Sequence, residues 1–216
     1  MTTTTPTRFV PGLKDIGQWV DVRIRQLQDG YLKDLSEAVS TLAKLRRGAG
    51  RPIEAVPELI GLTLDHHFYE KFSPHGSHIE DAEAAAHEAM TLYALHQQSK
   101  RDQRMHRRGR DLGGAVRRLM PPGDIDEPLR KKFVQAGSAI NHATRADRLR
   151  GIVQLLRAGD VPLDYGLLAD QLYEIRTSAG AARVRREWGR GFQAYRHEKN
   201  TAPDGDDEDS RIGTVD

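Results

Sequence analysis

Hydrophobic residues recur at intervals of three and four along much of the chain, the spacing that places side chains on one face of an α-helix. One such run extends from Leu13 to Leu27. A second run, from Leu32 to Leu45, begins after the turn signal Asp29-Gly30 and stops at the glycines that follow Arg46-Arg47. The pattern therefore predicts two helices at the start of the chain, separated by a turn at Asp29-Gly30.

The middle of the chain mixes irregular and helical patterns. Pro57 opens a short apolar stretch, and the polar residues from Asp65 to His78 contain the breakers Pro74 and Gly76, so this part is interpreted as a loop. The segment from Ile79 to Gln98 is rich in Ala and Glu and contains no Gly or Pro, which predicts a long helix.

Further helices are expected in the second half. Asp111 has the side chain of an N-cap and is expected to begin a short helix from Leu112 to Met120, which Pro121-Pro122-Gly123 closes. Thr144 or Asp147 can begin a later helix. The remaining apolar runs predict three more helices. The first contains Leu129, Phe133, Val134 and Ile140, and the second extends from Pro162 to Ile175. The last extends from Ala181 to Tyr195 and carries Val184, Trp188 and Phe192 on one face.

No segment shows the alternation typical of strands, so the predicted fold class is all-α, with two packed helical bundle domains. The Pro-Pro-Gly triplet at 121–123 is the expected boundary. The prediction divides the chain into a disordered N-terminus (1–11), an N-terminal helical domain (12–120), a C-terminal helical bundle (124–199) and an acidic disordered tail (200–216).

Composition limits the function classes. Of the 216 residues, 38% are hydrophobic and 6% are aromatic, so the core is expected to consist mainly of Leu, Ala, Val and Ile. The absence of cysteine excludes disulfides, thiolate zinc sites and thiol nucleophiles, and it is typical of a reducing compartment, so a cytoplasmic location is expected. No apolar run approaches the ~20 residues that span a bilayer, and no membrane association is expected.

Positive charge is concentrated in one place. Between Lys100 and Arg118 the chain carries eight Lys or Arg residues against two acids, Asp102 and Asp111. Such a segment repels itself unless a polyanion neutralises it, and the planar guanidinium group suits phosphate oxygens. The alternative is a solvated basic loop with no partner.

The end of the chain has the opposite charge. Without residues 201–216 the chain carries 32 basic and 25 acidic residues, a net charge of +7. A basic body with an acidic tail is a pattern found in nucleic-acid-binding proteins, where the tail competes with phosphate for the basic surface. A solubilising end is the alternative interpretation of the tail.

Basic residues also lie on the predicted helices, in positions that would line an extended groove for a phosphate backbone. The few free aromatic residues argue against base stacking, and Trp19 and Trp188 lie on apolar stripes that are typical of a core. The predicted nucleic-acid contacts are Arg46, Arg47, Arg51, Arg101, Arg104, Arg107, Arg108, Arg110, Arg117, Arg118, Arg130, Lys131, Arg145, Arg148 and Arg150.

The sequence contains no assembled catalytic or metal site. Its nine histidines include no His-Glu-x-x-His motif. Its glycine-rich segments match neither a phosphate-binding loop nor a dinucleotide-binding turn. We therefore expect no metal, no cofactor and no enzymatic activity, with a hydrolase built on His66, His67, His75 and His78 as the weakest alternative.

Several segments carry more specific information than composition does. The most distinctive is Tyr93-Ala94-Leu95-His96-Gln97-Gln98, which is followed by the basic segment and by Gly109-x-x-Leu112-Gly113-x-Ala115. Together with Leu42 to Gly48, Leu149 to Arg157, Leu163 to Leu172 and Val184 to Phe192, this ordered set covers about residues 10 to 197. The combination resembles the CasB family, the small subunit of the type I-E CRISPR surveillance complex Cascade.

The resemblance implies a two-domain helical protein without enzymatic activity, present in two copies along the inner face of a crRNA-guided assembly. Its partners would be the other Cascade subunits (backbone, large subunit and crRNA-end subunits), a second copy of itself, the crRNA, and the target and displaced DNA. It would hold the displaced strand of the R-loop through basic surface, without reading bases. The alternative is a helical protein-interaction scaffold whose basic faces dock partner subunits.

Two residues of the family motifs have an expected role, and two segments of the chain match no family motif. His96 and Gln97 lie at a helix end beside apolar neighbours and are expected to have hydrogen-bonded structural roles. Residues 65–78 and the tail after Asn200 match no family motif, so no role is assigned to either.

Overall fold

The computed structural model describes residues 12–72 and 78–195, so the predicted disordered N-terminus (1–11) and acidic tail (200–216) lie outside the described residues. Within these residues the fold is all-α, as predicted, and the one bridge of strand type joins His106 to Leu163. The helices are α1 (Asp15–Leu32), α2 (Ser36–Leu45), η1 (Arg46–Gly48), η2 (Ile53–Ala55), η3 (Pro57–Leu59), α3 (Ile60–Thr63), α4 (His66–Phe72), α5 (Ile79–Gln97), α6 (Leu112–Arg118), α7 (Glu127–Gly137), α8 (His142–Ala158), α9 (Tyr165–Glu174) and α10 (Ser178–Ala194).

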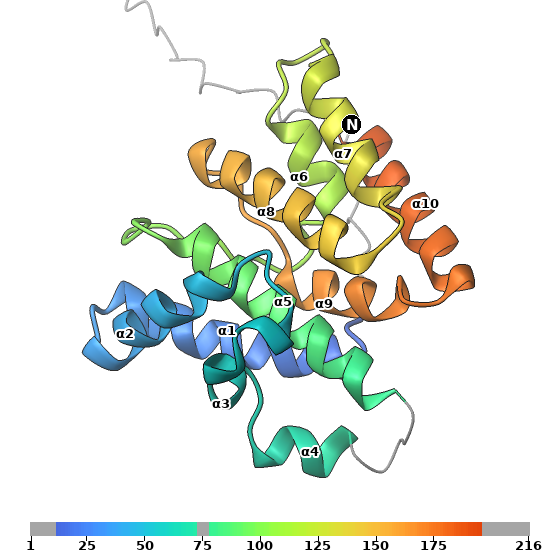
Figure 1. Ribbon diagram of the computed structural model, residues 1–216. Coiled ribbons are helices and arrows are strands. Elements are labelled where there is room, and N and C mark those ends of the chain that lie inside the picture. Colours follow the sequence, from blue (N-terminus) through green and yellow to red (C-terminus); the bar gives the residue numbers. More distant parts are fainter. Residues whose placement is uncertain (1–11, 73–77, 196–216) are drawn as a thin grey trace, which may run out of the picture.

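The helices form two groups that meet along α5 and α9 (Figure 1). In one group, α1 packs against α2, α5 and α9, and α3 and α4 lie beside it. In the other, α10 packs against α6, and α8 packs against α7. Contacts of α5 with both α8 and α9 join the groups into one body with a continuous apolar core.

The two groups do not follow the order of the chain. α6 precedes the Pro-Pro-Gly triplet at 121–123 but packs against α7, α8 and α10, which follow it. α9 follows the triplet but packs against α1 and α5. Segments from both sides of the triplet therefore share each group, and a domain boundary at 121–123 stays a prediction.

Polar caps begin most helices of the second half. Asp111 accepts a hydrogen bond from the Gly114 N–H at 2.8 Å, which confirms it as the N-cap of α6. Asp164 caps α9 in the same way, through the Leu167 N–H at 3.0 Å. α8 begins earlier than expected, because Asn141 rather than Thr144 or Asp147 accepts the capping bond.

The predicted turn at Asp29-Gly30 is wrong. α1 continues to Leu32, and the chain turns at Asp34, whose φ of 56° lies in the left-handed region. Gly30 is buried, and a Cβ there would lie 2.7 Å from the Cβ of Ala38 in α2. The glycine therefore allows α1 and α2 to approach each other and does not mark a turn.

The predicted loop at 65–78 is wrong in its first half. Residues His66–Phe72 form α4, and the carboxylate of Asp65 accepts a hydrogen bond from the Phe68 N–H at 3.2 Å. Phe68 and Phe72 are buried, and the Phe68 ring lies 5.5 Å from that of Trp19. Aromatic burial thus stabilises a short helix that polar composition concealed. Pro74 and Gly76 fall in 73–77, outside the described residues.

The core consists mainly of Leu, Ala, Val and Ile, as expected, with Trp188 among its largest fully buried side chains. The indole Nε1 of Trp188 donates to Oε1 of Gln171 at 2.8 Å, which satisfies its polar atom. Ile140 was expected to continue the helix of Leu129 and Phe133, but it lies beyond α7 and is fully exposed. Among the described residues, no helix combines the length and apolar character that crossing a membrane requires.

Candidate nucleic-acid interface

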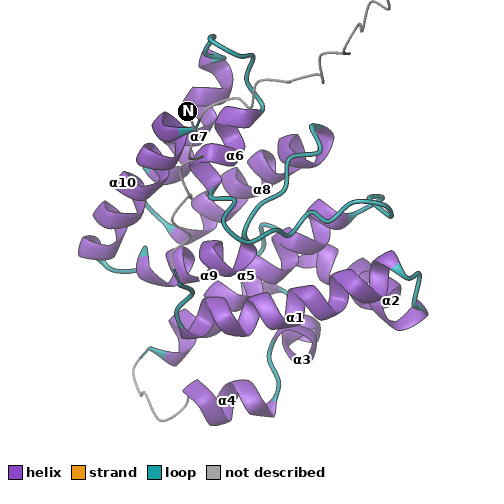
Figure 2. Ribbon diagram, turned by 180° about the vertical axis from the view of Figure 1, so that it is seen from behind, coloured by secondary structure: helices purple, strands orange, loops and turns teal. Residues whose placement is uncertain are grey.

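The basic segment, residues 100–110, runs between the two helix groups and is held by backbone hydrogen bonds (Figure 2). The Leu163 N–H donates to the Met105 carbonyl at 3.0 Å, and the Arg107 N–H donates back to the Leu163 carbonyl at 3.1 Å. The Asp164 N–H donates to the Arg110 carbonyl at 2.8 Å. The segment therefore has a fixed backbone path against the linker between α8 and α9.

Gln97 anchors the start of this segment from the end of α5. It is fully buried, its Nε2 donates to the carbonyls of Lys100 and Gln103 at 2.5 and 2.8 Å, and its Oε1 accepts from the Met105 N–H at 3.1 Å. His96 is also fully buried, with Nδ1 2.9 Å from the Tyr165 hydroxyl. The predicted structural roles of both residues are confirmed.

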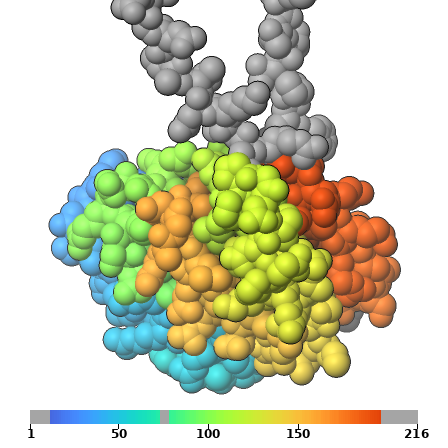
Figure 3. Space-filling view, turned by 90° about the horizontal axis from the view of Figure 1, so that it is seen from above, coloured from blue at the N-terminus to red at the C-terminus, as the bar shows by residue number. Residues whose placement is uncertain are grey.

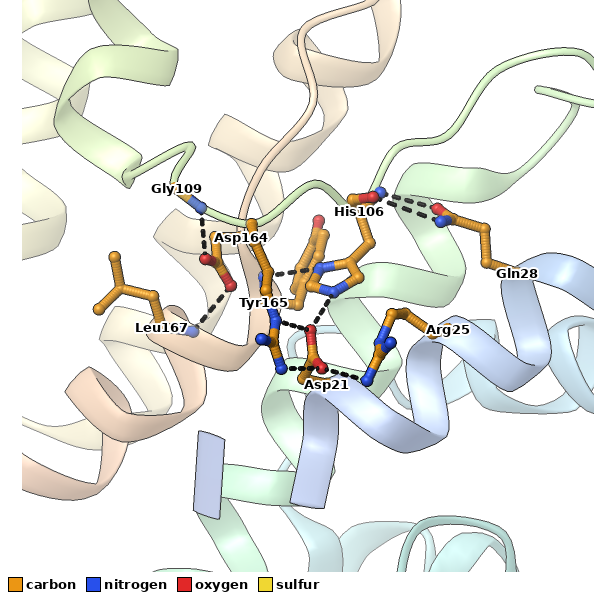
Figure 4. Close-up of polar contacts among 9 residues, drawn as sticks. Asp21, Arg25, Gln28, His106, Gly109, Asp164, Tyr165 and Leu167 are labelled. Carbon is orange, nitrogen blue, oxygen red and sulfur yellow. Dashed lines mark hydrogen bonds and ion pairs between the residues drawn. The ribbon is translucent and has the colours of Figure 1, made fainter. Parts of the chain in front are cut away.

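Asp21 of α1 anchors the middle of the segment (Figure 4). Its fully buried carboxylate accepts from Nε and Nη2 of Arg108 at 2.9 and 2.5 Å, and it lies 3.0 Å from Nε2 of His106 and 2.9 Å from Arg25. Burial alone would raise the pKa of Asp21, but the hydrogen bonds and charges of Arg108 and His106 outweigh it and hold the pKa below its ordinary value.

His106 is fixed in one tautomer by its two neighbours. Its Nδ1 accepts from the Tyr165 N–H at 3.2 Å, so Nε2 carries the proton that it donates to Asp21. Gln28 of α1 holds the backbone of His106, accepting from its N–H at 2.9 Å and donating to its carbonyl at 3.3 Å. The buried side of the segment is thus fully engaged with α1 and α9 (Figure 4).

Acidic residues on and beside α1 pair with much of the segment's charge. Arg101 forms an ion pair with Asp34, and Arg104 lies 2.6 Å from Asp29. With Arg108 bound to Asp21, these three arginines are neutralised by three carboxylates that precede them by about 70 to 90 residues. The net charge that the segment presents to a ligand is therefore smaller than its composition indicates.

Two arginines of the segment remain available. Arg107 is exposed and Arg110 is half-buried, and neither side chain has an acidic partner among the described residues. The backbone N–H of Gly109 between them donates to Asp164 at 2.8 Å. Arg107 and Arg110 thus extend from a backbone that is held at 106, 107, 109 and 110.

A second group of arginines lies where the chain just after η1 meets α8. Gly50, with φ of 77°, brings the chain so close to α8 that a Cβ there would lie 2.9 Å from Cδ of Arg150. Arg47 and Arg150 are exposed, without an acidic partner in the described part of the chain. Seven residues after Arg150, or about two turns further along α8, Arg157 donates to Oε1 of Gln98 at 2.6 Å.

These arginines and the basic segment share one surface. Gln98 and Arg101 line a pocket of about 370 Å³ together with Arg46. Figure 3 shows the orange end of α8 directly beside the green surface that includes the basic segment. These contacts bring Arg46, Arg150 and Arg157 together around Gln98 and Arg101, and Arg101 itself is paired with Asp34. We define the basic face as Arg46, Arg150 and Arg157 together with Arg47, which follows Arg46, and with Arg107 and Arg110 of the basic segment.

Arg157 was missed as a candidate contact. It follows Arg150 by seven residues and therefore lies on the same side of α8, which is the sequence signal that could have found it. Its bond to Gln98 places it beside the other arginines of the face.

Other predicted contacts have structural roles or lie elsewhere. Arg145 is 4% exposed and donates to the Ala139 carbonyl at 2.8 Å. Arg148 donates to the Gln135 carbonyl at 2.5 Å, and Arg51 to the Ala55 carbonyl at 2.9 Å. Outside the basic face, Arg117 and Arg118 lie on α6, and Arg130, which pairs with Glu127, and Lys131 lie on α7.

Within residues 12–72 and 78–195, no three His, Asp or Glu side chains gather as a metal-binding group. His66 and His67 stack on each other at 3.8 Å between ring centroids, and His67 lies 3.2 Å from Glu70. His75 lies outside the described residues.

Comparisons with known proteins agree with this architecture. Residues 41–192 match the family model of the CRISPR-associated protein Cse2. The chain belongs to the Cse2 family. The match covers most of the chain, from the second half of α2 into α10, and leaves out α1.

Two solved structures are similar to this fold. The crystal structure of CasB from Thermobifida fusca is 57% identical in sequence, with a TM-score of 0.77, over 84% of this chain and 99% of that chain. A chain of a CRISPR RNA-guided surveillance complex has 20% identity and a TM-score of 0.59, over 83% of this chain and 96% of that chain. No curated protein sequence matches the chain. The predicted resemblance to the CasB family is confirmed.

Proposed function

We propose that this chain is a non-catalytic nucleic-acid-binding structural subunit of the type I-E CRISPR complex Cascade. In this role it supports crRNA-guided binding of target DNA and holds the displaced strand of the R-loop. Membership of the Cse2 family supports the placement in a CRISPR assembly. The 20% identical neighbour is itself part of an RNA-guided surveillance complex.

The observation that carries the proposal is the basic face. Exposed and half-buried arginines from η1, the basic segment and α8 make up this face, and backbone hydrogen bonds together with the Gln97 side chain fix the path of the basic segment. Because the backbone is already ordered, these arginines lose only side-chain freedom when they bind phosphate, and each planar guanidinium can donate to two oxygens at once. An extended surface of such groups suits a phosphate backbone better than a single phosphate.

The same surface argues for binding without base recognition. The aromatic side chains beside the segment, Tyr31, Tyr93 and Tyr165, are all buried. They are therefore unavailable as stacking platforms for bases. Sequence recognition would then come from pairing of the guide RNA with the target, and this subunit would contact the backbone of either strand.

Binding of single-stranded DNA by the purified chain tests the proposal. We expect weak binding without base preference that weakens steeply between 50 and 200 mM salt, by roughly tenfold or more. The double variant Arg47→Ala/Arg150→Ala should bind more weakly by about tenfold, while Arg130→Ala/Lys131→Ala on α7 should change affinity by less than twofold. Equal losses in both double variants would contradict a role for the basic face.

The remaining partners follow from the same placement. We infer that the chain contacts other Cascade subunits, the crRNA and a second copy of itself, and that it functions in the cytoplasm. The exposed apolar side chains Val134 and Ile140, at the end of α7 and just after it, support a protein contact at this end of α7. Co-purification with the other subunits after nuclease treatment tests that contact.

A further inference from the structure

A polar pocket lies at the junction of the two helix groups, and none of its lining residues belongs to the basic face. Its volume is about 340 Å³, and it lies between α5, α8, the residues around η2 and the end of α9. Carboxylates dominate its polar lining, on a chain that otherwise presents positive charge. They belong to Glu54, Glu80, Asp81 and Glu88.

The arginines that line this pocket are already engaged. Arg51 donates to the Ala55 carbonyl at 2.9 Å, and Arg176 lies 3.1 Å from Asp81. No ion pair of Glu54, Glu80 or Glu88 is formed within the described residues. The pocket therefore has an excess of negative charge toward any molecule that enters it.

Two buried side chains of the pocket have unsatisfied polar atoms. His87 is 1% exposed, and neither of its ring nitrogens has a hydrogen-bond partner among the described residues. The same is true of Oε1 of Glu88, which is enclosed although the residue as a whole is half-buried. Buried polar atoms of this kind are rare because each unmade bond costs free energy, so they indicate that a bound group completes them.

The charge states of the two side chains define the missing group. Burial lowers the pKa of His87 to about 4, although the backbone of Arg51 and the charge of Glu54 act to raise it. The imidazole is therefore neutral and offers an acceptor nitrogen. Burial raises the pKa of Glu88 to about 7, although Arg176 and Arg145 act against it. A cation with several N–H donors would stabilise the ionised Glu88 and donate to His87 at the same time.

A guanidinium group meets these requirements. It carries five N–H donors in a planar arrangement and remains charged at all working pH values. Pro52, Ile53, Ala84 and Ala146 supply apolar walls for an aliphatic stem. A nucleotide fits less well, because its phosphate would approach four carboxylates.

We propose that the junction pocket receives an arginine side chain of a partner protein, with the guanidinium between Glu88 and the carboxylates of Glu54 and Glu80. The backbone carbonyls of that partner would accept from Nε of Arg176, a further buried atom without a hydrogen-bond partner in the described part of the chain. This contact is independent of the basic face, so it holds or fails separately from nucleic-acid binding.

Titration of the full chain with N-acetyl-arginine amide, followed by NMR shifts of the Ala84 and His87 amides, tests this proposal. We expect saturable binding with a dissociation constant on the order of 1 mM. Glu88→Gln should weaken it at least tenfold and Glu54→Gln about threefold, while Glu58→Gln, an exposed residue of η3 outside the pocket, should leave it unchanged.

Three results would overturn the proposal. The first is the absence of saturable shifts at these amides. The second is tighter binding of adenosine or guanosine monophosphate than of the arginine amide, which would assign the pocket to nucleic acid. The third is equal weakening by Glu58→Gln. If Glu88→Gln lowers the thermal midpoint so far that the chain unfolds, Glu54→Gln alone decides, because Glu54 is exposed and has no part in the core.

Discussion

One guanidinium, that of Arg108, donates to both carboxylate oxygens of Asp21, a residue that precedes it by 87 positions. Asp21 is fully buried, whereas the Arg108 side chain is 54% exposed. A buried carboxylate is costly unless its oxygens are paired, and here Arg108, His106 and Arg25 surround it. This ion pair therefore holds the basic segment against α1. It also determines which arginines of the basic segment face outward.

Removing this carboxylate charge should destabilise the fold. Asp21→Asn is expected to lower the free energy of unfolding by about 2 kcal/mol, because the amide cannot accept from Arg108, His106 and Arg25 as the buried carboxylate does. Urea denaturation measures this. Asp102→Asn, an exposed acid in the same segment, should cost less than about 0.5 kcal/mol. Equal stability of the two variants would contradict the role of Asp21.

Asp21→Asn should also change how the free energy of unfolding depends on pH in the acid range. The pKa of Asp21 lies below its ordinary value of 3.8, so its contribution to stability is present above pH 3.8 and is lost as the pH falls through the folded-state pKa. Below that range Asp21→Asn and the natural chain should approach the same stability. A difference between the two chains that does not shrink at all as the pH falls below 3.8 would show that packing, not charge, is responsible.

His96 gives a pH dependence at a higher range. Burial lowers its pKa from 6.5 to about 3, so the unfolded chain binds a proton below pH 6.5 and the folded chain does not. Stability is therefore fully present above pH 6.5 and falls below it by about 1.4 kcal/mol per pH unit for this group. Chemical denaturation of His96→Gln between about pH 6 and pH 4 should show a slope smaller by that amount. An unchanged slope would mean that His96 is protonated in the fold.

The contact between α6 and α10 depends on Gly113. A Cβ on Gly113 would collide with the carbonyl oxygen of Trp188, so Gly113→Ala must displace one helix. We expect a loss of about 3 kcal/mol or more in unfolding free energy. Gly151→Ala on α8 is the matched control, because a Cβ there meets nothing within 4 Å. It should stabilise the chain by about 0.5 to 1 kcal/mol, and a similar loss in both variants would contradict the packing argument.

Most of the fold could be predicted from the hydrophobic pattern. The long helix α5 and the Asp111 cap follow from local signals, and the structure confirms both. The pattern failed where long-range packing determines the local structure. Gly30 has the composition of a turn but is buried against Ala38, and α4 is held by the burial of Phe68 against Trp19. Neither contact is visible in a single sequence.

The candidate site was predictable in composition but not in detail. Arg107 and Arg104 are indistinguishable in sequence, yet Arg104 is paired with Asp29 of α1 and Arg107 has no acidic partner in the described ranges. Arg145 and Arg150 lie five residues apart on α8, and only Arg150 is exposed. Which arginines are free depends on the tertiary position of carboxylates far away in the chain.

The salt dependence of single-stranded DNA binding by Arg107→Ala, compared with Arg104→Ala, tests the central claim most directly. The slope of log affinity against log salt should fall by about 0.7 to 0.9 in Arg107→Ala, because one phosphate contact is lost. In Arg104→Ala it should fall by less than half that amount, since Asp29 already pairs with this guanidinium at 2.6 Å. An unchanged slope in Arg107→Ala, or no salt-dependent binding by the natural chain, would contradict the account.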